Sequence, residues 1–201
     1  MQPSPGTATV PTRPFSNLFQ FIACLVIRRG LFLIAVLAMS SLCSRAITLE
    51  ELRRIPNLTP QKFAGFFNDF EFQFHSEVQS PEVFLATQSG DCDDYAILAA
   101  TILKERGYTP RLITVRMPKV THVVCYIEET KSYLDYNKRA DLSPIVSSAP
   151  EIADIANSVA RSYNARWTSA SEFTFQDHLK RLVQTVVQPN KAESRFAGLF
   201  R

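Results

Sequence analysis

The chain has few glycines and few histidines, and its apolar runs are short. Only six glycines occur among 201 residues, which excludes a glycine-rich repeat array. Three histidines and the lack of a Cys-x-x-Cys motif disfavour a zinc site. No apolar run reaches the roughly 18–20 residues that a membrane-spanning helix needs. Hydrophobic residues make up 46% of the chain and charged residues 20%, so we expect a packed core in one domain of ordinary size.

Acidic residues are absent from residues 1–46, which hold four arginines and dominate the net charge of +3. Without that segment, 18 basic residues stand against 19 acidic ones, a net charge of −1. No basic face large enough to neutralise many phosphates is evident. Nucleic acid is therefore not an expected partner.

Residues 1–46 are predicted to be a signal or export segment. Two arginines precede the nine apolar residues Leu31–Met39, and Ser44 and Ala46 supply the small residues of a cleavage site, which is the order of a secretory signal. We expect an exported protein, periplasmic or extracellular. The alternative is an uncleaved anchor, which would associate the protein with a membrane through this hydrophobic segment.

Helices dominate the first half of the remaining chain and strands follow, so the predicted class is α+β. We expect helices over residues 48–56, 60–74, 81–87, 91–106, 151–163 and 176–187, and strands over 111–117, 122–128, 132–136 and 166–175. After Pro60, phenylalanines recur at steps of three and four and predict an aromatic stripe on the core: Phe63, Phe66, Phe67, Phe70 and Phe74. Trp167 and Phe173 are also predicted core residues, whereas His75 and His178 are predicted on solvent-facing helix surfaces. We assign 47–188 to one domain and 189–201 to a loose C-terminal tail.

One cysteine falls at the start of the clearest predicted helix. There, a Cys92 thiolate would face unpaired N–H groups and the positive end of the helix dipole, although the neighbouring aspartates oppose its charge. His122 begins a predicted strand, and Asp135 lies in the next strand. A thiol nucleophile needs a base, and the base needs an acceptor that holds its tautomer. Cys92, His122 and Asp135 supply these three groups in that order.

Three motifs in this region resemble the transglutaminase-like (papain-like) superfamily of cysteine proteinases and transglutaminases, of bacterial type. They are Gly90-Asp91-Cys92-Asp93-Asp94-Tyr95-Ala96 with the downstream Lys104-Glu105-Arg106-Gly107-Tyr108, then Thr121-His122-Val123-Val124, then Tyr133-Leu134-Asp135. The resemblance spans residues 60–137 well and 138–187 loosely. It implies a papain-like fold, with a central Cys-bearing helix packed on an antiparallel sheet that bears the His and the Asp.

The resemblance also implies a Cys-His-Asp triad: Cys92 as nucleophile, His122 as base and acid, and Asp135 as orienter. Such a domain would be a thiol-dependent amide hydrolase or acyl transferase that acts on a protein or peptide substrate through a thioester. We favour a cysteine peptidase over transamidation because the chain is short and shows no appended substrate domain. The alternative is a catalytically silent module that binds peptides or serves as a scaffold. The family's oxyanion hole adds an upstream side chain, for which Gln88 and Gln79 are candidates.

No cofactor is expected, with one alternative. Asp91, Asp93 and Asp94 are first interpreted as acids that favour a helix N-terminus. The sharper interpretation is a Ca²⁺ site, because hard cations prefer several carboxylates, and the resemblance to calcium-dependent bacterial proteinases permits it.

The two cysteines outside the export segment, Cys92 and Cys125, suggest a disulfide in an oxidising compartment. Strand alternation argues against this pairing, because His122 and Val124 share one face of the strand and Cys125 lies on the other. If His122 points at Cys92, Cys125 points away. We therefore expect two free thiols.

Overall fold

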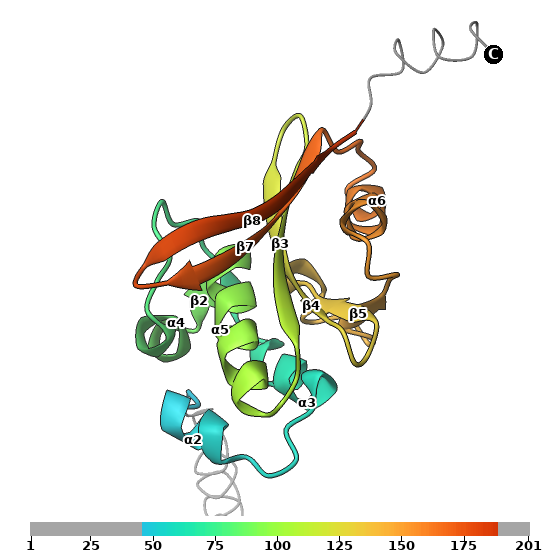
Figure 1. Cartoon of the computed structure of the whole chain (residues 1–201). Coiled ribbons are helices and arrows are strands. Elements are labelled where there is room, and N and C mark those ends of the chain that lie inside the picture. The colour runs from blue at the N-terminus through green and yellow to red at the C-terminus, as the bar shows by residue number, and fades with distance from the viewer. Residues whose placement is uncertain (1–45, 189–201) are drawn as a thin grey trace, which may run out of the picture. The chain divides into compact units, whose positions relative to one another are not determined.

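The computed structural model describes residues 46–188, which form helices followed by an antiparallel sheet (Figure 1). The helices are α2 (Leu49–Arg54), α3 (Pro60–Ala64), α4 (Pro81–Thr87), α5 (Cys92–Glu105) and α6 (Ile152–Ser162), with 3₁₀ turns at Gly65–Phe67 and Tyr136–Lys138. The strands are β1 (Glu71–Phe72), β2 (Ser89–Gly90), β3 (Pro110–Arg116), β4 (Thr121–Ile127), β5 (Ser132–Leu134), β6 (Ile145–Ser147), β7 (Ser169–Gln176) and β8 (Leu179–Val187).

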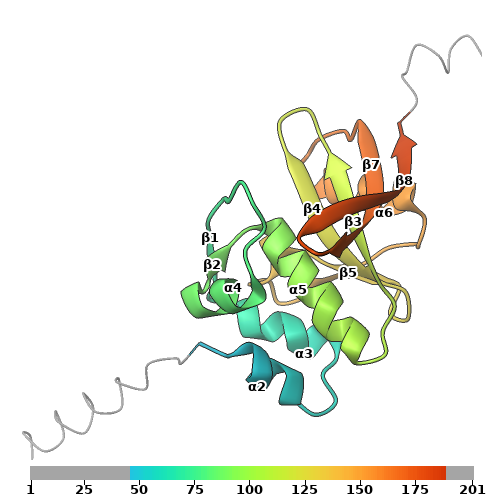
Figure 2. The same cartoon turned by 60° about the vertical axis from the view of Figure 1, so that its left-hand side comes forward.

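Six of the strands form one antiparallel sheet in the order β6-β5-β4-β3-β7-β8. Helix α5 packs on one face of this sheet and α6 on the other, so two hydrophobic clusters flank the strands (Figures 1 and 2). The short strands β1 and β2 pair in parallel outside the main sheet. The predicted α+β class, with a central helix on an antiparallel sheet, is confirmed.

Helix α5 is buried along most of its length and forms the centre of the larger cluster. Its start is fixed by a capping box, in which the Asp91 carboxylate accepts the Asp93 N–H and the Asp94 carboxylate accepts the Asp91 N–H, both at 3.1 Å. Its end is fixed by Gly107, which has a φ of +84°. Local sequence therefore fixes the position of Cys92 at the first turn.

The aromatic stripe predicted after Pro60 is only partly correct. Phe63, Phe67 and Phe70 are buried and join a ring cluster with Phe84, Tyr95 and Tyr136. The helix, however, ends at Ala64 and passes through a 3₁₀ turn, because the chain must turn to pair β1 with β2. Phe66 and Phe74 are consequently 38% and 76% exposed, and Phe74 and His75 lie in a loop rather than on a helix.

The helix predicted over residues 176–187 is wrong. This segment is strand β8, which pairs with β7 across a turn at Asp177 and His178, with φ values of 51° and 61°. Two consecutive residues with positive φ are the signature of a tight hairpin turn, and the β-branched residues near the end of β8 favour a strand. His178 is thus an exposed turn residue, while Trp167 and Phe173 are buried as predicted.

Both cysteines of the described region are free, as predicted. The expectation that Cys125 points away from the helix that bears Cys92 is wrong. Cys125 is fully buried together with Val123 on the side of the sheet that meets α5, whereas Val124 belongs to the cluster on the α6 side. Burial raises the pKa of the Cys125 thiol well above its usual range. Cys125 is therefore an inert core residue.

The predictions for the export segment, Ala46 apart, and for the tail 189–201 lie outside the described residues. Among residues 46–188, no helix is long and apolar enough to cross a membrane.

Candidate active site

Cys92, His122 and Asp135 meet at one end of the sheet, where α5 begins. Cys92 is the first residue of α5, is half-buried and lines an open cleft. His122 is the second residue of β4, and Asp135 follows the last residue of β5. The antiparallel pairing of β4 with β5 brings the start of one strand beside the end of the other, which explains the approach of His122 and Asp135.

The imidazole and the carboxylate form a buried pair. His122 Nε2 lies 2.8 Å from Asp135 Oδ1, and the two residues are only 2% and 1% exposed. The Asn137 N–H donates to the same carboxylate oxygen at 2.9 Å, since Asp135 also caps the 3₁₀ turn that follows β5. Turn and sheet thus hold the carboxylate in one orientation toward the ring.

The environment of His122 favours the protonated ring. Burial works to lower its pKa, but the hydrogen bond that the ring donates to Asp135 and the interaction with Cys92 outweigh burial and raise the pKa of His122 to about 10. Because Asp135 occupies Nε2, Nδ1 is the ring nitrogen left for the Cys92 sulfur. The Tyr163 ring, with its centroid 5.2 Å from that of His122, restricts the imidazole further.

A cleft of about 870 Å³ opens at this point, and Cys92 and His122 are among the residues that line it. The β1 segment, the β3–β4 hairpin and the β7–β8 hairpin contribute Phe72, Phe74, Arg116, Lys119, Val120 and Lys180 to its lining, and the start of α5, the 3₁₀ turn after β5 and the end of α6 contribute further residues. An extended chain several residues long can enter a cleft of this size. The arrangement can therefore present a thiol and a protonated imidazole to a bound carbonyl group.

A family model described as a transglutaminase-like domain matches residues 46–142, which contain Cys92, His122 and Asp135. Residues 46–142 belong to the transglutaminase-like superfamily. A search of curated proteins finds no match to this sequence. Among solved structures, calcium-bound LapG of Legionella pneumophila is 16% identical, with a TM-score of 0.40 over 69% of this chain and 77% of LapG. A second structure of LapG from the same organism has the same identity and TM-score, over 69% and 74%.

The acids around Cys92 serve mainly as structural acceptors in this transglutaminase-like domain. The two Asp94 oxygens accept the Gln79 backbone N–H at 2.7 Å and the Gln79 side-chain amide at 2.9 Å. The Asp91 oxygens accept the N–H groups of Asp93 and His75, both at 3.1 Å. Burial, followed by the neighbouring acids, raises the pKa of Asp91 to about 6.

This donor set does not fit a calcium ion. Of the predicted ligands, Asp91 and Asp93 each bring one potential ligand atom within 4.8 Å of the other and of the Cys92 sulfur, whereas Asp94 is not part of this group and both of its oxygens accept from Gln79. One of the three is a sulfur, which a hard cation does not prefer, and the carboxylates already accept N–H groups or pair with Lys180. We therefore assign the acidic cluster to capping of α5 and derive no chemistry from a metal there.

Three residues of the cleft carried no signal in the sequence: Lys180, Tyr163 and Asn137. Lys180 reaches from β8 to pair with Asp93, directly beside the nucleophile. Burial works to raise the pKa of Asp93, but hydrogen bonds with Asp91 and Lys180 lower it overall. Lys180 thus offsets part of the negative charge that the aspartates place near Cys92. Only the folding of the β7–β8 hairpin over α5 brings it there.

Neither oxyanion candidate is among the residues that line the cleft. The side-chain amide of Gln79 donates to Ser89 O and to Asp94 Oδ2, so both of its hydrogens are in use. Gln88 is the left-handed C-cap of α4 and is not among the residues that line the cleft. Gln79 therefore has no side-chain hydrogen left for an oxyanion. The backbone N–H of Cys92, at the first turn of α5, is the group that remains for an oxyanion.

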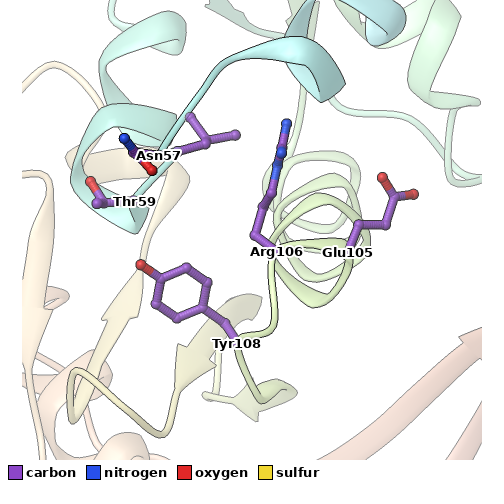
Figure 3. A pocket seen from close by; sticks show the side chains of 6 residues that line it. Asn57, Thr59, Glu105, Arg106 and Tyr108 are labelled. Carbon is purple, nitrogen blue, oxygen red and sulfur yellow. The ribbon is translucent and has the colours of Figure 1, made fainter.

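A second hollow, of about 500 Å³, lies between the α2–α3 connection and the end of α5 (Figure 3). Asn57, Thr59, Glu105, Arg106 and Tyr108 line it. Arg106 donates to the Arg53 carbonyl group, and Glu105 pairs with Arg53 at 3.1 Å. The hollow holds neither a cysteine nor a histidine, so the nucleophile–base chemistry belongs to the other cleft.

Proposed function

We propose that this chain is an exported thiol-dependent amide hydrolase, a cysteine peptidase in which Cys92, His122 and Asp135 act as nucleophile, acid–base and orienter. The observation that carries the proposal is the buried 2.8 Å contact between His122 and Asp135 beside a half-buried Cys92 that lines the cleft. A transglutaminase-like domain at residues 46–142 supports it. The substrate is a protein or peptide, and no cofactor takes part.

The reaction proceeds in two balanced steps. The Cys92 thiolate attacks the carbonyl carbon of a peptide bond, the C–N bond breaks, and the His122 imidazolium gives its proton to the leaving amine. A thioester and a neutral imidazole remain. The imidazole then takes a proton from water, the resulting hydroxide attacks the thioester, and a carboxylic acid leaves as the thiolate and imidazolium re-form. Asp135 holds Nε2 and stabilises the charged ring throughout.

Alkylation by iodoacetamide tests the nucleophile without requiring knowledge of the substrate. Peptide-level mass spectrometry of the full chain should find Cys92 modified rapidly near neutral pH. His122→Ala should slow this at least tenfold, since the imidazolium no longer stabilises the thiolate. His178→Asn is the matched control, because it removes an exposed histidine from a turn whose conformation Asn tolerates. If Cys92 reacts at the rate of an ordinary thiol, the silent binding module is the better description.

Hydrolysis and amide exchange can be separated in one assay. We expect casein incubated in H₂¹⁸O to release peptides with ¹⁸O in their new carboxyl groups. In parallel, the amine monodansylcadaverine should not be incorporated, because the cleft is open and admits water to the thioester. Incorporation of the amine without new carboxyl groups would reassign the domain to acyl transfer.

A further inference from the structure

The cleft beside Cys92 has an aromatic rim that the proposed chemistry does not use. Phe72 and Phe74 of the β1 segment line the cleft and are 61% and 76% exposed, and Val120 is 37% exposed. Large apolar side chains left open to water next to a reactive thiol are typical of a surface that becomes covered when a ligand binds. The exposure of the Phe72 and Phe74 rings is not explained by helix capping, by turn formation or by packing of the core.

The rim formed by the β3–β4 hairpin is basic. Arg116 ends β3 and Lys119 lies in the turn, and both side chains are exposed and line the cleft. Neither forms an ion pair with another described residue, whereas Lys180 in the same cleft is neutralised by Asp93. The chain beyond residue 46 has a net charge of −1, so the positive charge here is a local feature of the hairpin.

The two rims lie on different sides of the nucleophile. Figure 2 shows the β1 segment on one side of α5 and the β3–β4 hairpin on the other, with the start of α5, where Cys92 lies, between them. A peptide in extended conformation that crosses Cys92 therefore meets the aromatic rings on one side of its scissile bond and the two cations on the other.

We propose that the cleft selects peptides that carry a large apolar side chain on one side of the scissile bond and an acidic side chain on the other. This inference rests on the proposed peptidase function and adds a substrate class to it. The apolar side chain covers Phe72 and Phe74, and removal of this surface from water favours binding. The acidic side chain pairs with Arg116 and Lys119, which gives discrimination against basic peptides.

A positional-scanning library of internally quenched octapeptides tests the proposal with the full chain. Each sublibrary fixes one position and randomises the rest, and mass spectrometry locates the cleaved bond. One position should prefer Phe or Leu to Ser, and a position across the scissile bond should prefer Glu to Lys. Each preference should be about tenfold in kcat/KM, the scale expected for burial of one apolar side chain or for one favourable charge contact.

Two double variants assign the preferences to the two rims. Arg116→Glu with Lys119→Glu should reverse the preference from acidic to basic side chains, and Phe72→Ser with Phe74→Ser should remove the apolar preference. Lys104→Glu with Arg166→Glu is the matched control, since it makes the same charge change at exposed residues outside the cleft. It should retain the wild-type profile.

The results separate failure of this inference from failure of the proposed function. For each variant, the rate of peptide cleavage is divided by the rate at which iodoacetamide alkylates Cys92. The alkylation rate reports the reactivity of the Cys92–His122 pair and does not require a peptide to bind. Fast alkylation and peptide cleavage with a flat profile, or with a profile that the Arg116/Lys119 double variant does not change, overturn the substrate class only. Fast alkylation with no cleavage of any sublibrary overturns the peptidase proposal and leaves the reactive thiol. Slow alkylation of wild-type Cys92 overturns the peptidase proposal itself.

Discussion

The charge on Asp135 determines whether His122 holds its proton, and this can be tested by removing the charge while keeping the shape. The two residues are 2% and 1% exposed, so solvent screens their interaction poorly. With a pKa near 10, the ring is protonated in about 99% of molecules or more at pH 7.5. In Asp135→Asn the burial that works to lower this pKa is no longer opposed by a carboxylate. Only the interaction with Cys92 then opposes burial, so the pKa should fall towards the ordinary value of about 6.5.

The fraction of molecules with a protonated His122 ring determines how fast Cys92 is alkylated. At pH 7.5 a ring with a pKa of about 6.5 is protonated in about a tenth of molecules, so alkylation of Cys92 by iodoacetamide should slow about tenfold or more. Long-range ¹H–¹⁵N spectra of the ring should show an imidazolium in the wild type and a neutral imidazole in Asp135→Asn. Asp154→Asn, an exposed acid in the first turn of α6, is the control and should leave both readouts unchanged. A neutral ring in the wild type at pH 7.5, or an unchanged alkylation rate in Asp135→Asn, would refute this reasoning.

The same pKa has a consequence for stability, and three further outcomes are expected. Because the folded pKa of His122 is raised, its stabilising contribution is full below about pH 6.5 and is lost as the pH rises towards 10, so chemical denaturation should show a midpoint that declines across this window. Phe67→Ala, which removes a ring stacked among Phe63, Phe70 and Phe84, should lower the unfolding free energy by about 3–5 kcal/mol in urea titrations. Lys180→Met should change that free energy by less than about 1 kcal/mol because the pair is exposed, yet should slow Cys92 alkylation. EGTA should leave the alkylation rate unchanged, and activation by added Ca²⁺ would contradict our assignment of the acids to helix capping.

Much of the fold follows from signals that act over a few residues. The Asp91 cap and the Gly107 stop define α5, and the alternating strands with short turns define the meander of β3, β4 and β5. Caps, turns and hydrophobic periodicity depend on nearby backbone groups only, so they can be recognised without knowing what packs where. For the same reason the order of Cys92, His122 and Asp135, each at the end or start of such an element, already indicated a common site.

The failures share a different cause. Residues 176–187 were predicted as a helix because short apolar segments fit both periodicities, and the pairing with β7 that decides the strand comes from another part of the sheet. The oxyanion candidates Gln79 and Gln88 could not be judged from sequence, since the partner that occupies Gln79, Asp94, lies fifteen residues away.

The sequence by itself determined which chemical groups are present, where the central helix α5 begins and ends, and the α+β class. The tertiary structure alone decided that Phe72 and Phe74 face the cleft, that Lys180 neutralises Asp93, and that Tyr163 restricts the His122 ring. The physical reason is range: a cap or a turn is satisfied by neighbours in the chain, whereas cleft walls and ion pairs between elements depend on how whole hairpins pack.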